Sequence, residues 1–130
     1  MIRAVCLWAS LASAAIAETP MTGEEFEAYV TGRTLTYATQ NAFHGVERYL
    51  PRRRVYWQNR HGECIKGRWY EEGTNICFVY ENDPEPKCWE VFRTQNGLRA
   101  DFTSYAGPPA IVEVTDSPEP LICPGPELLG

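Results

Sequence analysis

Short segments in which apolar and polar residues alternate fill most of the chain between residues 34 and 114, and turn residues separate them. Alternation with a period of two is typical of β-strands that have one buried face. The segments predict strands at Thr34–Ala38, Gly45–Tyr49, Arg54–Asn59, Glu63–Glu71, Asn75–Glu81, Lys87–Arg93, Leu98–Thr103 and Ala110–Val114. Residues 95–97 are a strong hairpin signal, and residues 82–86 are expected to form a longer turn. The pattern predicts a mainly β fold, an antiparallel meander of about eight strands curled into a small barrel or half-barrel.

One short helix is expected before the first strand. Thr22 and Glu25 have the spacing of a capping box, in which each side chain accepts a hydrogen bond from a backbone N–H of the other residue. Phe26 and Val30 then lie on one face of a helix, and Gly32 follows where a left-handed C-terminal cap is expected. Such a short helix needs a surface to pack against.

Alternate residues of a strand face opposite sides of the sheet, so the pattern also assigns side chains to faces. One face is expected to collect Ile65, Trp69, Ile76, Phe78, Tyr80, Trp89 and Val91. The opposite face is expected to hold Cys64, Lys66, Arg68, Cys77 and Cys88. The aromatic face is the expected core of the domain.

The first seventeen residues have the features of an export signal. They contain Arg3, an apolar stretch over residues 5–16, and a small-residue cleavage site at residues 15–17. The apolar stretch falls short of the ~20 residues that cross a bilayer, and no later segment replaces it. We therefore expect a signal peptide at 1–17, no membrane span after its removal, and one domain over 18–130 with a proline-rich tail from about residue 115.

Four cysteines remain after that removal, and an even number in a small exported domain is typical of disulfides. Three pairings of the four are possible. The strand register favours a Cys77–Cys88 bridge across one hairpin and a Cys64–Cys123 bridge that ties down the tail. A zinc site is the alternative, but the spacings of thirteen, eleven and thirty-five residues lack the close cysteine pairs that such sites use.

Charge excludes one class of partner. Residues 1–17 hold one arginine and no acidic residue, so eleven basic residues remain against seventeen acidic ones, a net charge of −6. General nucleic-acid binding needs a positive surface, and we expect none here.

Candidate catalytic residues are few. His44 and His61 could act as bases or metal ligands but are expected in solvated turns. A carboxylate pair for glycoside hydrolysis could come from Glu47, Glu63, Glu71 and Glu72. The chain has no motif for a nucleophile, a zinc protease or a phosphate loop. The sequence predicts no catalytic residue, no metal and no cofactor.

Two groups of residues are candidates for binding. Arg52, Arg53 and Arg54 form the one local basic concentration, and arginine binds carboxylates and phosphates bidentately. Such a group suits an anionic ligand, but the sequence favours the simpler interpretation of a solvated hairpin tip after Pro51. The second group could line a ligand cup at a barrel mouth or only fill the core, and consists of Tyr49, Trp57, Trp69, Tyr80 and Trp89.

A family resemblance rests on the spacing of Cys, Trp and Gly between residues 62 and 89. The arrangement Gly62-Glu63-Cys64-x-x-Gly67-x-Trp69-Tyr70, then Ile76-Cys77-Phe78-x-Tyr80 and Cys88-Trp89, resembles short exported bacterial proteins with a lipocalin-like or half-barrel β-fold, catalogued as domains of unknown function. The resemblance covers roughly residues 22–102 and implies a periplasmic location, while the signal peptide alone also permits secretion. It supplies no functional residues.

The expected function is an exported, non-enzymatic binding or accessory module of the cell envelope, acting on a small ligand or an envelope protein. One alternative is an inhibitor of a wall-degrading or proteolytic enzyme, for which a rigid β-scaffold is well suited. The second alternative is a small hydrolase.

Overall fold

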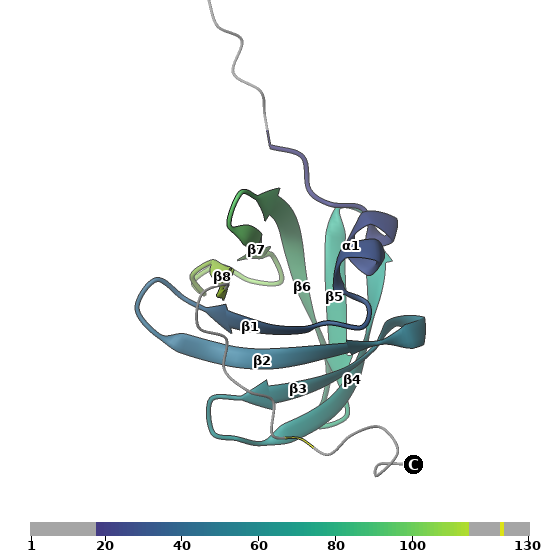
Figure 1. Cartoon of the computed structure of the whole chain (residues 1–130), viewed down its shortest axis with the longest axis vertical. Coiled ribbons are helices and arrows are strands. Elements are labelled where there is room, and N and C mark those ends of the chain that lie inside the picture. Colours follow the sequence, from purple (N-terminus) through teal and green to yellow (C-terminus); the bar gives the residue numbers. More distant parts are fainter. Residues whose placement is uncertain (1–17, 115–122, 124–130) are drawn as a thin grey trace, which may run out of the picture.

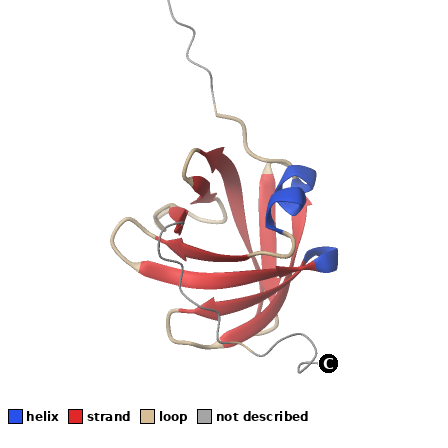
Figure 2. Cartoon of the chain, viewed as in Figure 1, coloured by secondary structure: helices blue, strands red, loops and turns tan. Residues whose placement is uncertain are grey.

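The structure is a computed structural model that describes residues 18–114 and Cys123. The predicted signal peptide and most of the predicted proline-rich tail lie outside the described residues. Figure 1 shows the course of the chain, and Figure 2 shows that strands make up most of it.

Eight antiparallel strands form a closed barrel in sequence order. The strands are β1 (Thr34–Ala38), β2 (Phe43–Leu50), β3 (Arg54–Asn59), β4 (Cys64–Glu72), β5 (Asn75–Tyr80), β6 (Asp83–Thr94), β7 (Gly97–Phe102) and β8 (Ile111–Val114). Closure comes from β1, which pairs with β2 on one side and with β8 on the other. The predicted fold class is confirmed, with a full barrel and not a half-barrel.

Helix α1 (Gly23–Val30) packs against one end of the barrel (Figures 1 and 2). Both hydrogen bonds of the predicted capping box are present at Thr22 and Glu25, and Gly32 has a φ of +83° just after the helix. The ring of Phe26 makes edge contacts with those of Tyr49 and Trp69, at 5.7 and 5.0 Å between centroids. No helix among the described residues combines the length and hydrophobicity that crossing a membrane requires.

The predicted division of faces is confirmed. Cross-strand partners place Trp69 opposite Phe78, and Ile76 opposite Trp89, on the inner face. The inner face and α1 together build the buried core, which consists of Met21, Phe26, Val30, Leu35, Tyr37, Tyr49, Val55, Trp69, Ile76, Phe78, Val91, Leu98, Ala100 and Ile111. The interior is thus packed with side chains where α1 covers it.

Strand β6 begins earlier than the sequence predicts, because Asp83 and the residues after it extend the strand into the expected turn. This stretch contains Pro84 and Pro86, which have no N–H to donate. Before Trp89, β5 is the only described strand that pairs with β6, since β7 pairs with β6 over residues 89–94. The prolines therefore remove no ladder hydrogen bond on the β7 side.

Both expected disulfides are present in the structure. Cys77 and Cys88 are direct cross-strand partners on the outer face and are bonded to each other. Cys64 at the start of β4 is bonded to Cys123. The first bridge links neighbouring strands, and the second links residues 59 positions apart.

A glycine on β4 makes room for an aromatic ring. A Cβ built on Gly67 would lie 2.6 Å from Cδ1 of Tyr80 and 2.7 Å from the carbonyl oxygen of Val79. Gly67 and Tyr80 are cross-strand partners, so the ring of Tyr80 occupies the space that a side chain at position 67 would need. Gly45 makes the same kind of room for the indole of Trp57.

Removing either disulfide is expected to destabilise the barrel, because each bridge restricts the unfolded chain. In the chain-entropy model, Cys77→Ser/Cys88→Ser lowers the free energy of unfolding by about 3 kcal/mol and Cys64→Ser/Cys123→Ser by about 4 kcal/mol. Urea unfolding of the oxidised proteins measures both losses in the free energy of unfolding. Reductant should lower the midpoint of the wild type but not that of a variant lacking all four cysteines; an equal shift in both would contradict a structural role for the bridges.

Substituting Gly67 with Ala is expected to lower the free energy of unfolding by about 1–3 kcal/mol through overpacking. Thermal unfolding measures the loss. The cost should be smaller in a Tyr80→Leu background, which removes the ring that the new methyl group meets. The same cost in both backgrounds would show that the ring is not the cause.

Candidate functional site

The five aromatic candidates for a ligand cup all face the barrel interior, as their strand register requires. Tyr49 and Trp69 are 2% and 3% exposed and lie under α1, so no solvent-borne ligand reaches them in this conformation. Trp57, Tyr80 and Trp89 are partly buried and pack against the same core. The five residues therefore contribute to the packed interior.

A carboxyl group lies inside this barrel. Glu47 faces inward from β2 and is 2% exposed. The hydroxyl of Tyr80 donates to both of its oxygens, at 3.1 and 3.2 Å. Burial raises the pKa of Glu47 well above its ordinary value, and the hydrogen bond from Tyr80 opposes this only in part. A neutral Glu47 is the form that this interior favours.

Two further inward tyrosines lie beside Glu47. The hydroxyls of Tyr37 and Tyr49 are 2.8 Å apart and hydrogen-bonded. Burial raises the pKa of both phenols, and the nearby Glu47 carboxyl adds to the effect. These tyrosines thus remain neutral and serve as hydrogen-bonding groups within the core.

A second buried acid, Glu113, lies near the end covered by α1. It accepts hydrogen bonds from the Tyr29 hydroxyl at 2.7 Å and the Leu98 amide at 2.9 Å, and it pairs with Arg33 at 3.5 Å. A buried carboxylate with this many donors ties α1 to β7 and β8. The sequence pattern predicted no role for Glu113, although its position in β8 has inward parity.

The candidate bases are not arranged for catalysis in the described part of the chain. The ring of His44 lies 5.4 Å from that of Trp57 and 6.3 Å from that of Trp89, and burial lowers its pKa. His61 is exposed in the turn after β3. Neither imidazole is hydrogen-bonded to a carboxylate within residues 18–114.

The other candidate acids are exposed on the surface. Glu63, Glu71 and Glu72 lie at the ends of β4, and Glu71 accepts a hydrogen bond from the Gly23 amide at the start of α1. Glu72 lies near Cys77 and Cys88, the one set of potential metal ligands in the described residues. The two sulfurs are bonded to each other, so they are not available as thiolates.

The arginine trio is not one site, because its side chains go to different places. Residues 51–53 form a short 3-10 turn in which Arg52 and Arg53 have φ values of 63° and 57°. Arg53 turns toward α1, where it pairs with Glu27 at 3.1 Å and stacks 4.5 Å from the ring centroid of Trp69. Arg52 is exposed. Only Arg54 reaches the outer face of the sheet.

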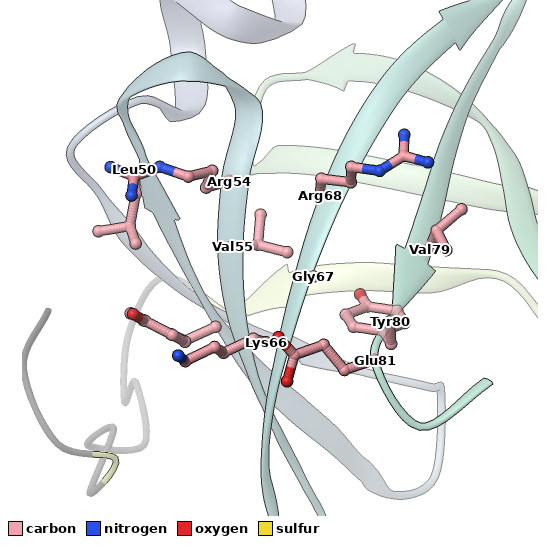
Figure 3. A pocket seen from close by; sticks show the side chains of 10 residues that line it. Leu50, Arg54, Val55, Lys66, Gly67, Arg68, Val79, Tyr80 and Glu81 are labelled. Carbon is pink, nitrogen blue, oxygen red and sulfur yellow. The ribbon is translucent and has the colours of Figure 1, made fainter. Parts of the chain in front are cut away.

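That outer face carries a hollow of about 470 Å³ over strands β2 to β5, which we call the outer groove. Figure 3 shows it from close by. Its walls are formed by Leu50, Arg54, Tyr56, Lys66, Arg68 and Val79. Gly67 and Tyr80 also line it, so the ring that reaches Glu47 inside the barrel borders the groove as well.

The strand register explains the groove's charge. Arg54 on β3 lies directly opposite Arg68 on β4. In the same row of cross-strand partners, Leu50 of β2 lies opposite Arg54 and Val79 of β5 lies opposite Arg68. Like charges in directly opposed positions destabilise a sheet. Among the ion pairs of the described residues, none includes Arg54 or Arg68. Lys66 and Glu81 also line the groove, which thus offers three cations, one carboxylate and apolar side chains. Such a lining can bind an anionic group that carries an apolar portion.

The sequence could have indicated this groove. The predicted faces already placed Lys66 and Arg68 on the outer side with the cysteines, and a short hairpin joins β3 to β4. Counting back across that hairpin brings Arg54 opposite Arg68. In the sequence the three adjacent arginines resemble one basic unit, whereas the turn at residues 51–53 directs their side chains to different places.

The buried Glu47 carboxyl predicts a pH-dependent stability. In the unfolded chain this group ionises near its ordinary pKa of 4.5, whereas burial raises the pKa in the folded state. Between these two values the unfolded state loses its proton first, so this contribution to stability is complete below pH 4.5 and declines as the pH rises toward the folded pKa. For each unit by which burial raises the pKa of Glu47, the free energy of unfolding falls by about 1.4 kcal/mol at pH values above the folded pKa.

Glu47→Gln isolates this effect, because an amide keeps an acceptor for Tyr80 and does not ionise. Urea unfolding from pH 4 to pH 9 should show the variant gaining stability relative to the wild type as the pH rises. A pH-independent difference between the two proteins would mean that Glu47 does not titrate as its burial requires.

No family model matches the chain, and no curated protein or solved structure matches it either. Its function is therefore inferred from the geometry of its own residues.

Proposed function

We propose that the chain is an exported, non-enzymatic binding module whose outer groove holds an anionic group of a small ligand or an envelope partner. The observation that carries the proposal is the direct opposition of Arg54 and Arg68 in a hollow on an otherwise acidic protein. A sheet position that places like charges together weakens the fold unless a bound anion offsets the repulsion.

Export is supported by three features. Residues 1–17 have the pattern of a signal peptide, and the spacing of Cys, Trp and Gly resembles exported lipocalin-like bacterial proteins. The two disulfides fit an oxidising compartment, such as a periplasm or the cell exterior.

The groove is a better binding surface than the barrel interior. The inner face is filled by packed aromatic and aliphatic side chains, whereas the guanidinium-bearing residues Arg54 and Arg68 are exposed. Arginine forks bind a carboxylate or a phosphate through two parallel hydrogen bonds. Leu50, Val79 and the ring of Tyr56 offer apolar contact beside them.

Binding of small anions tests the proposal. In a titration followed by NMR chemical shifts, N-acetylglutamate and inorganic phosphate represent the two anion chemistries. The largest shifts are expected at the amides of residues 54, 67, 68 and 79. Arg54→Gln/Arg68→Gln should weaken binding by about tenfold or more, because the charge-assisted interactions of both arginines are lost.

A matched control separates a specific site from general attraction. Arg52→Gln/Arg60→Gln removes the same charge from two exposed arginines that do not line the groove. This control should bind as the wild type does. Equal weakening in both double variants, or shifts centred away from the groove, would refute the proposed site.

A further inference from the structure

Tyr80 lies in the barrel wall between the outer groove and a buried carboxyl group. Its ring lines the groove next to Gly67, its cross-strand partner, which has no side chain to cover the ring (Figure 3). On the inner side its hydroxyl donates to both oxygens of Glu47, at 3.1 and 3.2 Å. One side chain therefore reaches from the groove to Glu47.

The anion proposed for the groove lies near this side chain. Arg68 follows Gly67 on β4, and Arg54 is the cross-strand partner of Arg68. An anion held by the two guanidinium groups is thus separated from Glu47 by the wall at Tyr80. At roughly 10 Å and an effective dielectric constant of about 20, two unit charges change a binding constant by about tenfold. Screening by about 0.1 M salt reduces the effect to about threefold.

Among the described residues, no cation is bonded to Glu47 to offset a negative charge. Tyr37, Tyr49 and Tyr80 face it from β1, β2 and β5. Burial raises the pKa of each phenol, and the Glu47 charge raises it further. An ionised Glu47 therefore acts on its surroundings as an uncompensated charge.

The other strands and α1 bring little charge to this interior. Glu113 on β8 is the second buried acid, and Tyr29 of α1 donates to it. His44 packs on Trp57, the cross-strand partner of Glu47, and burial and then Arg60 lower its pKa, which favours the neutral imidazole. Inward side chains from β3, β4, β6 and β7 that do not titrate include Val55, Trp69, Val91, Leu98 and Ala100.

We propose that anion binding in the outer groove is coupled to the ionisation of Glu47, so that the protein holds the anion while Glu47 is neutral and releases it once Glu47 has lost its proton. The inference rests on the proposed function and adds the regulation of the same site. The bound anion and the Glu47 carboxylate repel each other across the wall. By linkage, the anion favours protonated Glu47 by the same factor by which the proton favours anion binding.

N-acetylglutamate measures the coupling, because its two carboxylates keep their charge from pH 6 to pH 9. Its dissociation constant, followed by amide chemical shifts, should rise about threefold to tenfold as the pH increases through the folded pKa of Glu47. The amide spectrum at each pH verifies that the protein is folded, so a loss of binding is not a loss of structure. An affinity that stays constant over this range would overturn the coupling.

The carboxyl carbon of Glu47 reports its ionisation directly by NMR. Saturating N-acetylglutamate should raise the pKa of Glu47 by about 0.5 to 1.0, the counterpart of the threefold to tenfold change in affinity. The proposal is excluded if this pKa is the same with and without the ligand. It is equally excluded if Glu47 keeps its proton at every pH at which the protein is folded.

Two single variants locate the titrating group. Glu47→Gln does not ionise and keeps an acceptor for Tyr80, so its affinity for N-acetylglutamate should not fall as the pH rises. Glu24→Gln removes an exposed acid that does not line the groove and should keep the pH dependence of the wild type. A fall of wild-type size in Glu47→Gln would assign the effect to another group and contradict the proposal.

Tyr80→Phe tests the link itself, because it keeps the ring that lines the groove and removes the hydroxyl. The hydrogen bond from Tyr80 lowers the pKa of Glu47. Without it, the fall in affinity should move to a higher pH. A fall at the same pH as in the wild type would show that Tyr80 does not connect Glu47 to the groove.

Failure of the coupling and failure of the site have different signatures. If N-acetylglutamate binds through Arg54 and Arg68 while its affinity ignores the state of Glu47, the coupling is excluded and the anion site stands. If neither N-acetylglutamate nor phosphate binds at pH 6 or at pH 9, the proposed function fails as well.

Discussion

The pairing of β8 with β1 is the constraint on which the rest of this structure depends. Thr36 lies opposite Val114 and Ala38 opposite Val112, and these contacts turn a meander into a closed barrel. Closure removes both free edges of the sheet and divides every strand into inward and outward positions. The short strand β8 thus creates the interior that buries Glu47 and the exterior that carries the groove.

The interior is occupied by the protein's own side chains, which directs any binding role to the outside. Phe26 of α1 contacts Tyr49 and Trp69 and covers one end, while Glu113 ties α1 to β7 and β8. Among the residues that the structure describes, Tyr80 and no cation is bonded to the buried Glu47 carboxyl. A neutral acid in such a place costs less than an unpaired buried charge.

Tyr80 connects the two sides of the barrel wall. Its hydroxyl is bonded to Glu47 inside, and its ring occupies the space next to Gly67, where the outer groove is hollowed. A larger residue at position 67 would displace this ring. The shape of the groove and the packing of the core therefore both depend on one glycine.

The sequence by itself determined the features that have local causes. The capping box at Thr22 begins α1, period-two alternation assigned Trp69 and Trp89 to the inner face, and a hairpin register placed Cys77 opposite Cys88. Only the tertiary structure decided what depends on segments distant in the chain: full closure by β8, the burial of Glu47 and Glu113, and the separation of Arg53 from Arg54. The physical reason is that capping, alternation and hairpin pairing act over a few residues, whereas burial and charge proximity are set by how all eight strands close around one core.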